Sequence, residues 1–342
     1  MPDNTQAGSP PPHVQLVQMG RAFMVSRIVY AAAKLGLADQ LASGSKNAAE
    51  LAGPMRVDAP SLHRLMRALA SLGILTERSE HFYALTALGE ALKTGAPGSA
   101  RASVLMQGSP WFQTSFDHVV DVIQTGKNGF ERVHNQQLFD YLEQHPEDGS
   151  LYNEAMAGLT SQEPAAVVAA YDFAPFNTVI DVGGGTGNMI TTILTRHPGL
   201  RGVLFDKPNV VADAVPLLEA KGLSSRISVE AGDFLQTVPH GGEAYVLSHV
   251  IHNFSEDQCL TILGHVHEAM KLTGRLLIIE TVLLPGDLPD PGKMLDMTML
   301  TVGRGQERTE NEYSHLLTRA SFRVTRVVPT KSRVSVVEAE RI

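Results

Sequence analysis

The chain has 342 residues, of which 43% are hydrophobic and 19% are charged, and its formal net charge is −8 at pH 7. This composition excludes an intrinsically disordered chain, and the acidic balance is a poor match for a nucleic-acid-binding protein. No apolar run reaches the roughly 18 residues of a membrane span, and the single cysteine, Cys259, cannot form an internal disulfide. We therefore expect a cytoplasmic globular protein without membrane contact, preceded by a disordered tail over residues 1–12.

The first half of the chain has the periodicity of helices. Apolar residues recur every three or four positions from Val14 to Leu41. Two further helices, with Gly73 as the stop of the second, are followed by two short extended runs. Helix, helix and hairpin in this order are typical of a winged helix. The sequence predicts an all-helical, winged-helix-like domain over 13–105. A helical linker over 106–170 is expected to follow and to contribute to the substrate pocket. One helix of this linker is predicted over 148–169.

From Asn177 onward, apolar runs of strand length alternate with helical segments, which predicts βαβ units and a parallel sheet. These runs are 178–182, 202–206, 227–230, 244–247 and 276–280. The last two runs, 322–328 and 334–338, are predicted to form an antiparallel hairpin. Ser255 and Thr309 each begin a capping-box pattern, which predicts a helix start. We expect a doubly wound α/β domain over 171–342.

A glycine-rich loop, Gly183-Gly184-Gly185-Thr186-Gly187, follows the first predicted strand and precedes a helix. A dinucleotide fingerprint needs a glycine where Asn188 stands, and a phosphate-binding P-loop needs a lysine that is missing here. What remains is the acidic Asp181 followed by Gly-x-Gly-x-Gly. This arrangement suits a nucleoside with a cationic tail.

Two more acidic residues follow the next strands in order. Asp206 ends the second strand, 19 residues after Gly187, where a carboxylate can accept hydrogen bonds from both ribose hydroxyls. The third strand is followed by Gly232-Asp233-Phe234, where a carboxylate and an aromatic face can meet an adenine. Each feature alone is common in α/β domains. The three features in this order predict a binding site for S-adenosylmethionine.

Together with Phe205-Asp206-Lys207-Pro208 and Glu307-Arg308-Thr309, these motifs resemble the S-adenosylmethionine-dependent O-methyltransferases. The group concerned contains plant caffeate and flavonoid enzymes and bacterial polyketide and phenazine tailoring enzymes. The resemblance covers nearly the whole chain. It implies a homodimer formed by the winged-helix-like dimerisation domain, a Rossmann-like seven-stranded catalytic domain and a role in secondary metabolism. The cofactor contacts that it implies are Gly183, Gly184, Gly185, Asp206, Gly232, Asp233, Phe234 and Ser248, the last standing where plant enzymes usually have lysine.

His252 follows the fourth strand, at the edge of the sheet where the glycine loop also lies. A lone histidine there is often a solvated loop residue. The resemblance makes it the catalytic base, flanked by Glu280 and Glu307, and a histidine can take the proton of an acceptor hydroxyl. The plant pattern His-Asp-Trp is replaced by His252-Asn253-Phe254, which removes a negative charge beside the base and can shift the pH optimum.

The predicted acceptor is a small aromatic or polyketide-type molecule with a phenolic hydroxyl. Methionine and aromatic side chains give an adaptable apolar wall for a flat acceptor, although the same residues at helical spacing also form cores. Asp296 could bind substrate or cap structure. The predicted pocket residues are Met106, Gln107, Trp111, Phe112, Tyr152, Met156, Leu159, Asp296, Met297 and Met299.

Three alternatives compete with this interpretation. A metal site is not expected, because His249, His252, His265 and His267 do not share one face. A winged-helix DNA-binding regulator is disfavoured, because residues 1–100 contain nine basic and seven acidic residues. A cyclase, decarboxylase or hydroxylase on the same fold would use the cofactor without methyl transfer, and the retained histidine and glutamates argue against it.

Overall fold

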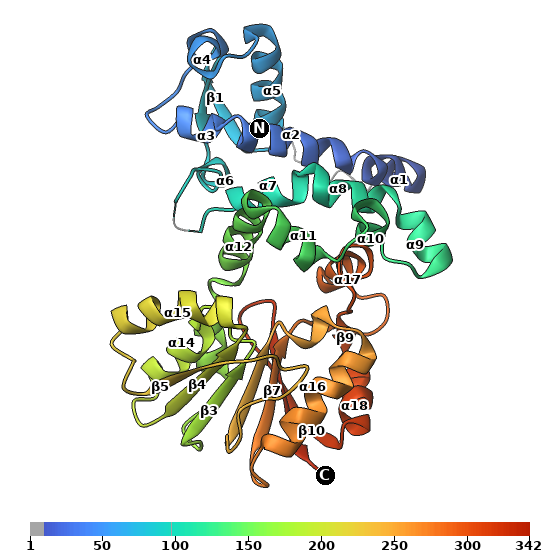
Figure 1. Cartoon of the computed structure of the whole chain (residues 1–342). Coiled ribbons are helices and arrows are strands. Elements are labelled where there is room, and N and C mark those ends of the chain that lie inside the picture. The colour runs from blue at the N-terminus through green and yellow to red at the C-terminus, as the bar shows by residue number, and fades with distance from the viewer. Residues whose placement is uncertain (1–9, 97) are drawn as a thin grey trace, which may run out of the picture. The chain divides into compact units, whose positions relative to one another are not determined.

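The computed structural model of the chain describes residues 10–96 and 98–342, so most of the predicted tail lies outside the described residues. The described residues belong to two compact units (Figure 1): an N-terminal unit, up to residue 113 and including 142–159, and a C-terminal unit, 114–141 and 160–342. The predicted linker is therefore divided between the units. Helix α1 already begins at Pro12, inside the segment predicted as a tail.

The N-terminal unit contains the predicted order of helix, helix and hairpin. Asn47 and Glu50 form a capping box at the start of the first helix of this motif, and Asp58 caps the second. Leu62, Met66 and Leu69 line one face of the second helix and are buried in the core of the unit. The elements are α1 (Pro12–Gly20), α2 (Ala22–Lys34), α3 (Leu37–Gln40), α4 (Ala48–Met55), α5 (Ala59–Ser71), β1 (Leu75–Ser79), β2 (Phe82–Leu85), α6 (Ala87–Glu90) and α7 (Arg101–Gly108).

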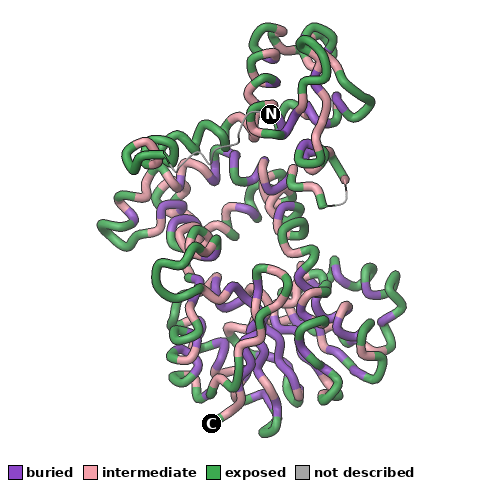
Figure 2. Tube along the Cα trace, turned by 180° about the vertical axis from the view of Figure 1, so that it is seen from behind, coloured by how far each residue is buried: buried purple, intermediate pink, exposed green. Residues whose placement is uncertain are grey.

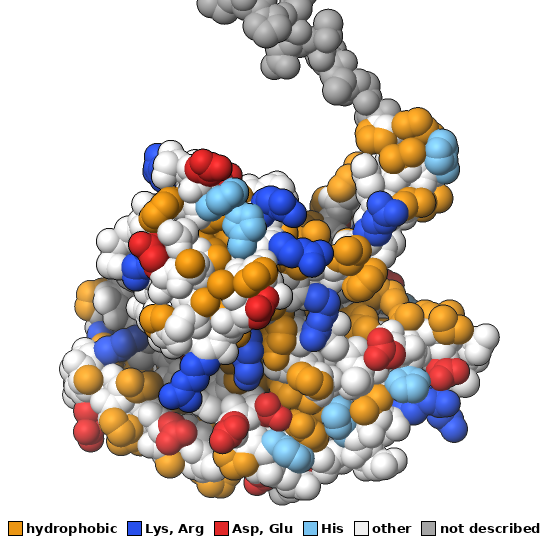
Figure 3. Space-filling view, turned by 90° about the horizontal axis from the view of Figure 1, so that it is seen from above, with side chains coloured by type: hydrophobic (Ala, Val, Ile, Leu, Met, Phe, Trp, Pro, Cys, Tyr) orange, Lys and Arg blue, Asp and Glu red, His pale blue; other side chains and the backbone are white. Residues whose placement is uncertain are grey.

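The first two helices of this unit expose large apolar side chains. Met19 is 69% exposed and Phe23 is 65% exposed, and Leu16, Val17 and Met24 are exposed as well. Figure 3 shows hydrophobic side chains gathered on this part of the surface. Soluble proteins rarely expose such a group of side chains unless it meets a partner.

The helices between the predicted domains are shorter than the sequence suggests. The single helix predicted over 148–169 is wrong, because the chain leaves the helical path at Ser161 and Gln162. Pro164 stands in the first turn of the second helix, where its missing N–H costs no hydrogen bond. These helices are α8 (Pro110–Asp117), α9 (Val119–Thr125), α10 (Gly129–His134), α11 (Leu138–Gln144), α12 (Pro146–Thr160) and α13 (Glu163–Ala170).

The C-terminal unit has the predicted alternation of strands and helices, and both capping boxes, at Ser255 and Thr309, are formed. Within the described residues, no helix combines the length and apolar character needed to cross a membrane. The elements are β3 (Thr178–Val182), α14 (Asn188–Arg196), β4 (Arg201–Asp206), α15 (Pro208–Ala220), β5 (Ile227–Ala231), β6 (Ala244–Ser248), η1 (Ile251–Asn253), α16 (Glu256–Ala269), β7 (Arg275–Glu280), β8 (Val282–Leu283), α17 (Gly292–Thr301), β9 (Arg308–Thr309), α18 (Glu310–Arg319), β10 (Phe322–Pro329) and β11 (Ser335–Arg341).

The sheet has seven strands in the order β10-β11-β7-β6-β3-β4-β5, which confirms the Rossmann-like α/β fold. The five strands from β7 to β5 are parallel, and β11 runs antiparallel to both of its neighbours, as the predicted hairpin requires. The chain order reverses between β3 and β6. Ligands of doubly wound sheets bind at the carboxyl ends of the strands at such a switch point, so the loops after β3 and β6 are placed for binding.

Alternate residues of each strand feed two separate cores, as the pleat of a strand requires. Ile180 and Leu247 pack with α16 and α18 on one face, whereas Val179 and Val246 pack with α13, α14 and α15 on the other. Figure 2 shows the buried strands at the centre of this unit. With both faces covered, the carboxyl edge is where the loops of the sheet can form a site.

Candidate active site

The glycine loop leaves β3 in a conformation that side chains would oppose. Gly183 and Gly185 have φ values of 70° and 58°, in the left-handed region that glycine adopts without steric cost. A Cβ atom on Gly183 would lie 2.8 Å from Cγ2 of Val250, in the loop after β6. A Cβ atom on Gly185 would meet nothing within 4 Å. The loop is thus packed against the β6 loop on one side and open on another.

Asp181, at the end of β3, is completely buried, and neither of its carboxyl oxygens has a hydrogen-bond partner. Burial raises the pKa of its carboxyl to about 7. It lies against the glycine loop, because a Cβ atom on Gly184 would come within 2.6 Å of Asp181 Oδ2. A buried acid without a partner is costly in the free protein and suits a ligand that carries a positive charge.

The other predicted cofactor residues lie along the same edge. Asp206 accepts hydrogen bonds from the Gly185 N–H (2.8 Å) and the Lys207 N–H (2.7 Å), which joins the ends of β3 and β4. Asp233 accepts from the Leu235 N–H at 2.9 Å after β5. Gly232 packs against the Phe205 ring. The Phe234 ring is edge-on to the Phe254 ring, with the two ring centroids 5.4 Å apart. Ser248 is half-buried at the end of β6.

His252 lies in η1, directly after β6, and is 7% exposed. Its Nδ1 lies 2.7 Å from Oε1 of Glu307, which is itself buried. If the neutral ring donates its Nδ1–H to this carboxylate, its Nε2 has a free lone pair. The ring is therefore arranged to accept a proton at Nε2.

The two carboxylates predicted to flank the ring have different positions. Glu280 does not contact the ring: its Oε1 accepts the backbone N–H of His252 at 3.0 Å, and its Oε2 accepts the Tyr313 hydroxyl. The parallel pair β8–β9 joins Val282 to Arg308 and thereby holds Glu307 beside the end of β7. Glu280 thus holds the backbone of His252, and Glu307 holds its ring.

The charges around His252 favour its protonated form. Burial lowers the pKa of the imidazole, but the hydrogen bond to Glu307 and the negative charges of Glu280 and Glu307 outweigh burial, so this pKa lies above its ordinary value. The positive charge of Arg333 lowers the pKa of His252 and so opposes the two glutamates. A positive charge that develops on the ring during proton transfer is therefore stabilised.

Sequence reasoning missed Tyr313, which donates to Glu280, and gave the buried Arg308 no role of its own. Tyr313 is completely buried in α18, where the Glu280 charge and burial raise the pKa of its hydroxyl well above the ordinary value. Arg308 is 2% exposed, and its guanidinium lies 6.0 Å from the Tyr313 ring. In the sequence, Tyr313 has only the spacing of a core residue. Arg308 could have been singled out, because it stands in the Glu307-Arg308-Thr309 motif.

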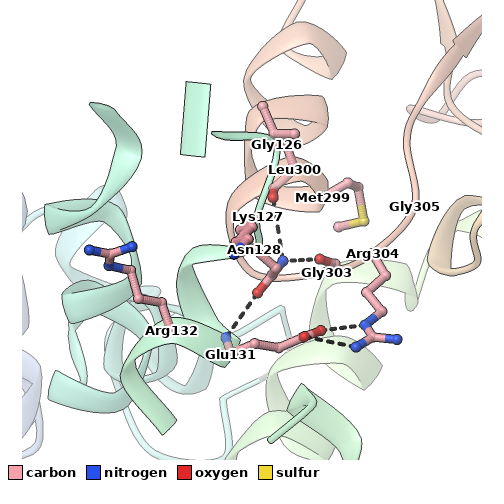
Figure 4. Close-up of a pocket in the computed structure, with 10 residues that line it drawn as sticks. All are labelled: Gly126, Lys127, Asn128, Glu131, Arg132, Met299, Leu300, Gly303, Arg304 and Gly305. Carbon is pink, nitrogen blue, oxygen red and sulfur yellow. Dashed lines mark hydrogen bonds and ion pairs between the residues drawn. The ribbon is translucent and has the colours of Figure 1, made fainter. Parts of the chain in front are cut away.

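A cavity of about 480 Å³ lies in the C-terminal unit between α9, α10 and α17 (Figure 4). Its polar side chains are largely paired with one another: Asn128 caps α10 and donates to the carbonyls of Leu300 and Gly303, and Glu131 forms an ion pair with Arg304. At its edge, a Cβ atom on Gly305 would lie 1.9 Å from the His252 carbonyl oxygen. The cavity wall thus braces the loop that carries Glu307.

The predicted acceptor residues belong to both units. In the N-terminal unit, Met106, Trp111 and Phe112 are buried, Gln107 and Leu159 are exposed, and Tyr152 and Met156 are half-buried. In the C-terminal unit, Met297 and Met299 lie on α17, and only Met299 of this pair lines the cavity of Figure 4. Asp296 accepts the backbone N–H of Glu307 at 2.9 Å, so it holds the carboxylate partner of His252.

The four histidines considered for a metal do not gather. His252 and His249 lie side by side with rings 5.2 Å apart, whereas His265 contacts the Phe234 carbonyl and His267 packs on Phe322. Across the residues that the structure describes, no group of three His, Cys, Asp or Glu side chains has the arrangement of a metal site.

Nearly the full length of the chain is similar to known proteins. Residues 116–323 match the O-methyltransferase domain family, and residues 17–95 match the O-methyltransferase dimerisation domain. The chain belongs to the O-methyltransferase family. A phenazine O-methyltransferase of Lysobacter antibioticus is 40% identical over the full length of both chains. A phenazine-1-carboxylate N-methyltransferase of Pseudomonas aeruginosa is 32% identical over 95% of this chain and 96% of its own.

Solved structures agree with the assignment of this O-methyltransferase. The crystal structure of CalO1, a methyltransferase in calicheamicin biosynthesis in its S-adenosylhomocysteine-bound form, superposes with a TM-score of 0.85 at 34% identity. The superposition covers 96% of this chain and 98% of the CalO1 chain. The O-methyltransferase therefore uses S-adenosylmethionine, and its site fits this cofactor: the open side of Gly185 leaves room, and the unpartnered Asp181 suits a cationic tail.

Proposed function

We propose that the O-methyltransferase methylates a phenolic hydroxyl of a small aromatic secondary metabolite, with His252 as the general base. The observation that carries this proposal is the buried His252–Glu307 pair, at 2.7 Å, at the switch point of the sheet. The names of the relatives support an aromatic acceptor, since a phenazine enzyme is among them. Met297 and Met299 of α17 would contribute to the wall that the acceptor contacts.

The acceptor hydroxyl is the difficult part of the reaction. A phenol has a pKa near 10 and is mostly protonated at neutral pH. When bound, S-adenosylmethionine supplies a methyl group on a positively charged sulfur, which the acceptor oxygen attacks. His252 Nε2 takes the hydroxyl proton, and the Glu307 carboxylate stabilises the imidazolium that results. Positioned bases of this kind contribute roughly 10² to 10⁴ in rate.

The residues that would hold the cofactor follow the strand ends from β3 to β6. The glycines Gly183 to Gly185 and Asp181 would meet its methionine end, and Asp206 its ribose. Asp233 and Phe234, after Gly232, would meet the adenine, and Ser248 would add a contact from β6. Asp206 already spans the first two strand ends through Gly185, so its carboxylate is held in place before binding.

The test uses calorimetry and turnover together. Purified protein is titrated with S-adenosylmethionine and S-adenosylhomocysteine in EDTA, and micromolar binding of both would support the cofactor site and its independence from metal. In His252→Asn, we expect S-adenosylhomocysteine affinity within about twofold of wild type and kcat lower by roughly 10² or more. In Asp206→Asn, the expected loss is in affinity, about 1–3 kcal/mol. Unchanged turnover in His252→Asn would remove this residue from the mechanism.

The acceptor atom is determined from the product of a phenol and aminophenol screen. A mass gain of one methyl, with S-adenosylhomocysteine released, separates methyl transfer from cyclase, decarboxylase or hydroxylase chemistry. Because one relative is named an N-methyltransferase, the methylated atom is then located by NMR. Methylation of nitrogen alone would contradict the phenolic proposal.

We also propose a cytoplasmic homodimer formed through the N-terminal unit. The match of residues 17–95 to the dimerisation domain supports it. So does the apolar exposed face of α1 and α2, which includes Met19 and Phe23.

A further inference from the structure

A second cluster of charged side chains lies beside the base. His249 directly follows β6, and its Nε2 lies 2.6 Å from Oε2 of Glu163, the first residue of α13. The other oxygen of Glu163 accepts from Nε of Arg333 at 2.7 Å, in the turn between β10 and β11. The Glu163 side chain is only 4% exposed. The cluster thus joins three separate elements at the carboxyl edge of the sheet.

His249 is also tied to the backbone that carries the base. Its N–H donates to the Ile279 carbonyl at 3.1 Å, and its own carbonyl accepts from the Asn253 side chain at 2.8 Å. These bonds enclose the turn in which His252 lies. His249 has a φ of 55°, which is unfavourable for a residue with a Cβ and persists only where its surroundings hold it. The hydrogen bond to Glu163 supplies such a hold.

We propose that His249, Glu163 and Arg333 form a positioning cluster for the base: they hold the turn after β6 so that His252 faces Glu307, and Arg333 adds a positive charge that opposes the two glutamates. The proposal rests on the proposed role of His252. It assigns a function to three residues that the methyl-transfer chemistry does not itself use.

The charges around His252 show why such a cluster matters. Glu307, from the loop before β9, and Glu280, from β7, favour the imidazolium, and Tyr313 of α18 and Arg308 of β9 lie behind them. Asp296 of α17 is bound to the Glu307 backbone. The His249 ring lies 5.2 Å from the His252 ring and connects it to the Glu163–Arg333 pair.

These opposing charges set the proton affinity of the base. The two glutamates raise the pKa of His252 against the effect of burial, and Arg333 lowers it. Bonds from His249 and Arg333 outweigh the burial of Glu163, so the pKa of Glu163 is lowered and it stays ionised. A base acts best when its pKa is near the working pH. Arg333 limits the rise in the His252 pKa that the glutamates cause.

The first experiment measures the His252 pKa directly. The C2–H signals of ¹³C-labelled histidine are titrated by NMR in the cofactor-free protein, and the His252 signal is assigned with His252→Asn. In Arg333→Met, we expect the His252 titration to move to higher pH and the acidic limb of the kcat/KM profile to move with it. Arg333→Lys keeps the charge and should restore both toward wild type.

A matched control separates this effect from the loss of any buried ion pair. Arg326 donates to the buried Glu338 at 2.8 Å in the same hairpin, and Arg326→Met should leave the His252 titration unchanged. Equal His252 titrations in Arg333→Met, Arg326→Met and wild type would overturn the charge effect.

The second experiment tests the positioning role. His249→Asn removes the ring, while asparagine accepts the left-handed backbone better than other residues. We expect kcat to fall about tenfold, with S-adenosylhomocysteine affinity within about twofold of wild type. Wild-type kcat in both His249→Asn and Glu163→Gln would overturn this role. If instead His252→Asn retains turnover, it is the base assignment that fails, because the NMR titration reports on the cluster without turnover.

Discussion

The ring of His252 is held by one carboxylate and its backbone by another, and this division has a consequence for pH dependence. Because the pKa of His252 is raised above its ordinary value of about 6.5, activity should decrease as the pH falls through that raised value. Glu307→Gln removes the hydrogen-bonded charge, so we expect the acidic limb of kcat/KM to move to lower pH while kcat falls. A pH–rate series for wild type and variant measures both. An acidic limb that stays in place would separate Glu307 from the titrating group.

The raised pKa of His252 also contributes to stability, with a sign opposite to its effect on activity. The folded protein binds the proton more tightly than the unfolded chain. The contribution of His252 is therefore complete below its unfolded pKa and is lost as the pH rises through the folded pKa. Stability and proton acceptance by this residue thus favour opposite ends of the same pH range.

We expect the buried Asp181 to destabilise the cofactor-free protein, and we expect cofactor binding to offset this cost. Its pKa of about 7 in the folded protein exceeds that of an unfolded aspartate, near 4, so free-protein stability should decrease as pH rises between these values. In Asp181→Asn, we expect a higher melting temperature of the free protein at pH 8 and a smaller shift with S-adenosylhomocysteine. Thermal melts at pH 5 and pH 8 measure this. Asp206→Asn is the control, since Asp206 is already hydrogen-bonded; it should weaken binding without stabilising the free protein.

At this scale, the sequence predicted the residues that stand in local motifs but not those that reach them from far away. His252 and Asp206 follow strands that can be read from a few neighbouring residues. Tyr313 and Glu163 contact Glu280 and His249 across 33 and 86 positions of the chain. Such contacts depend on how helices pack on the sheet, which periodicity does not specify.

Among the elements, α10 is connected to the candidate site by the loop after α17, which leads to Glu307. Asn128 caps α10 and also binds two carbonyls at the end of α17, and the same loop continues to Glu307. In Asn128→Ala, we expect the free energy of unfolding to fall by about 1–2 kcal/mol and kcat to fall several-fold with S-adenosylhomocysteine affinity unchanged. Denaturant unfolding and turnover measure the two effects.

Asn47→Ala is the matched control, because Asn47 caps α4 in the N-terminal unit in the same way. It should lose a similar free energy of unfolding and keep its kcat. Equal kcat values in both variants would show that Asn128 stabilises α10 without acting on the base.

Element starts were predictable where a capping side chain and a hydrophobic pattern agree, as at Ser255 and Thr309. The helix over 148–169 was predicted too long, because the polar residues Ser161 and Gln162 form a turn between two helices. Pro164 was the available signal, since a proline favours the first turn of a new helix.

For the whole molecule, the exposed face of α1 and α2 predicts the oligomeric state. Met19 and Phe23 are the most exposed large apolar residues of these helices together with Leu16. Light scattering at micromolar concentration should give twice the mass of 36.9 kDa. Phe23→Glu should shift the protein toward the monomer, because a charge cannot be buried in an apolar interface without a partner. A wild-type protein of monomer mass would contradict the prediction.

The short β8–β9 pair closes a loop. It pairs Val282 with Arg308 and Leu283 with Thr309, so the two ends of the segment from residue 284 to 307 lie side by side. Within this loop, α17 carries Met297 and Met299, and Asp296 accepts the Glu307 backbone N–H. Glu307 itself stands at the end of the same loop. A change in the length of this loop would therefore displace the carboxylate that holds His252 together with the side chains of α17.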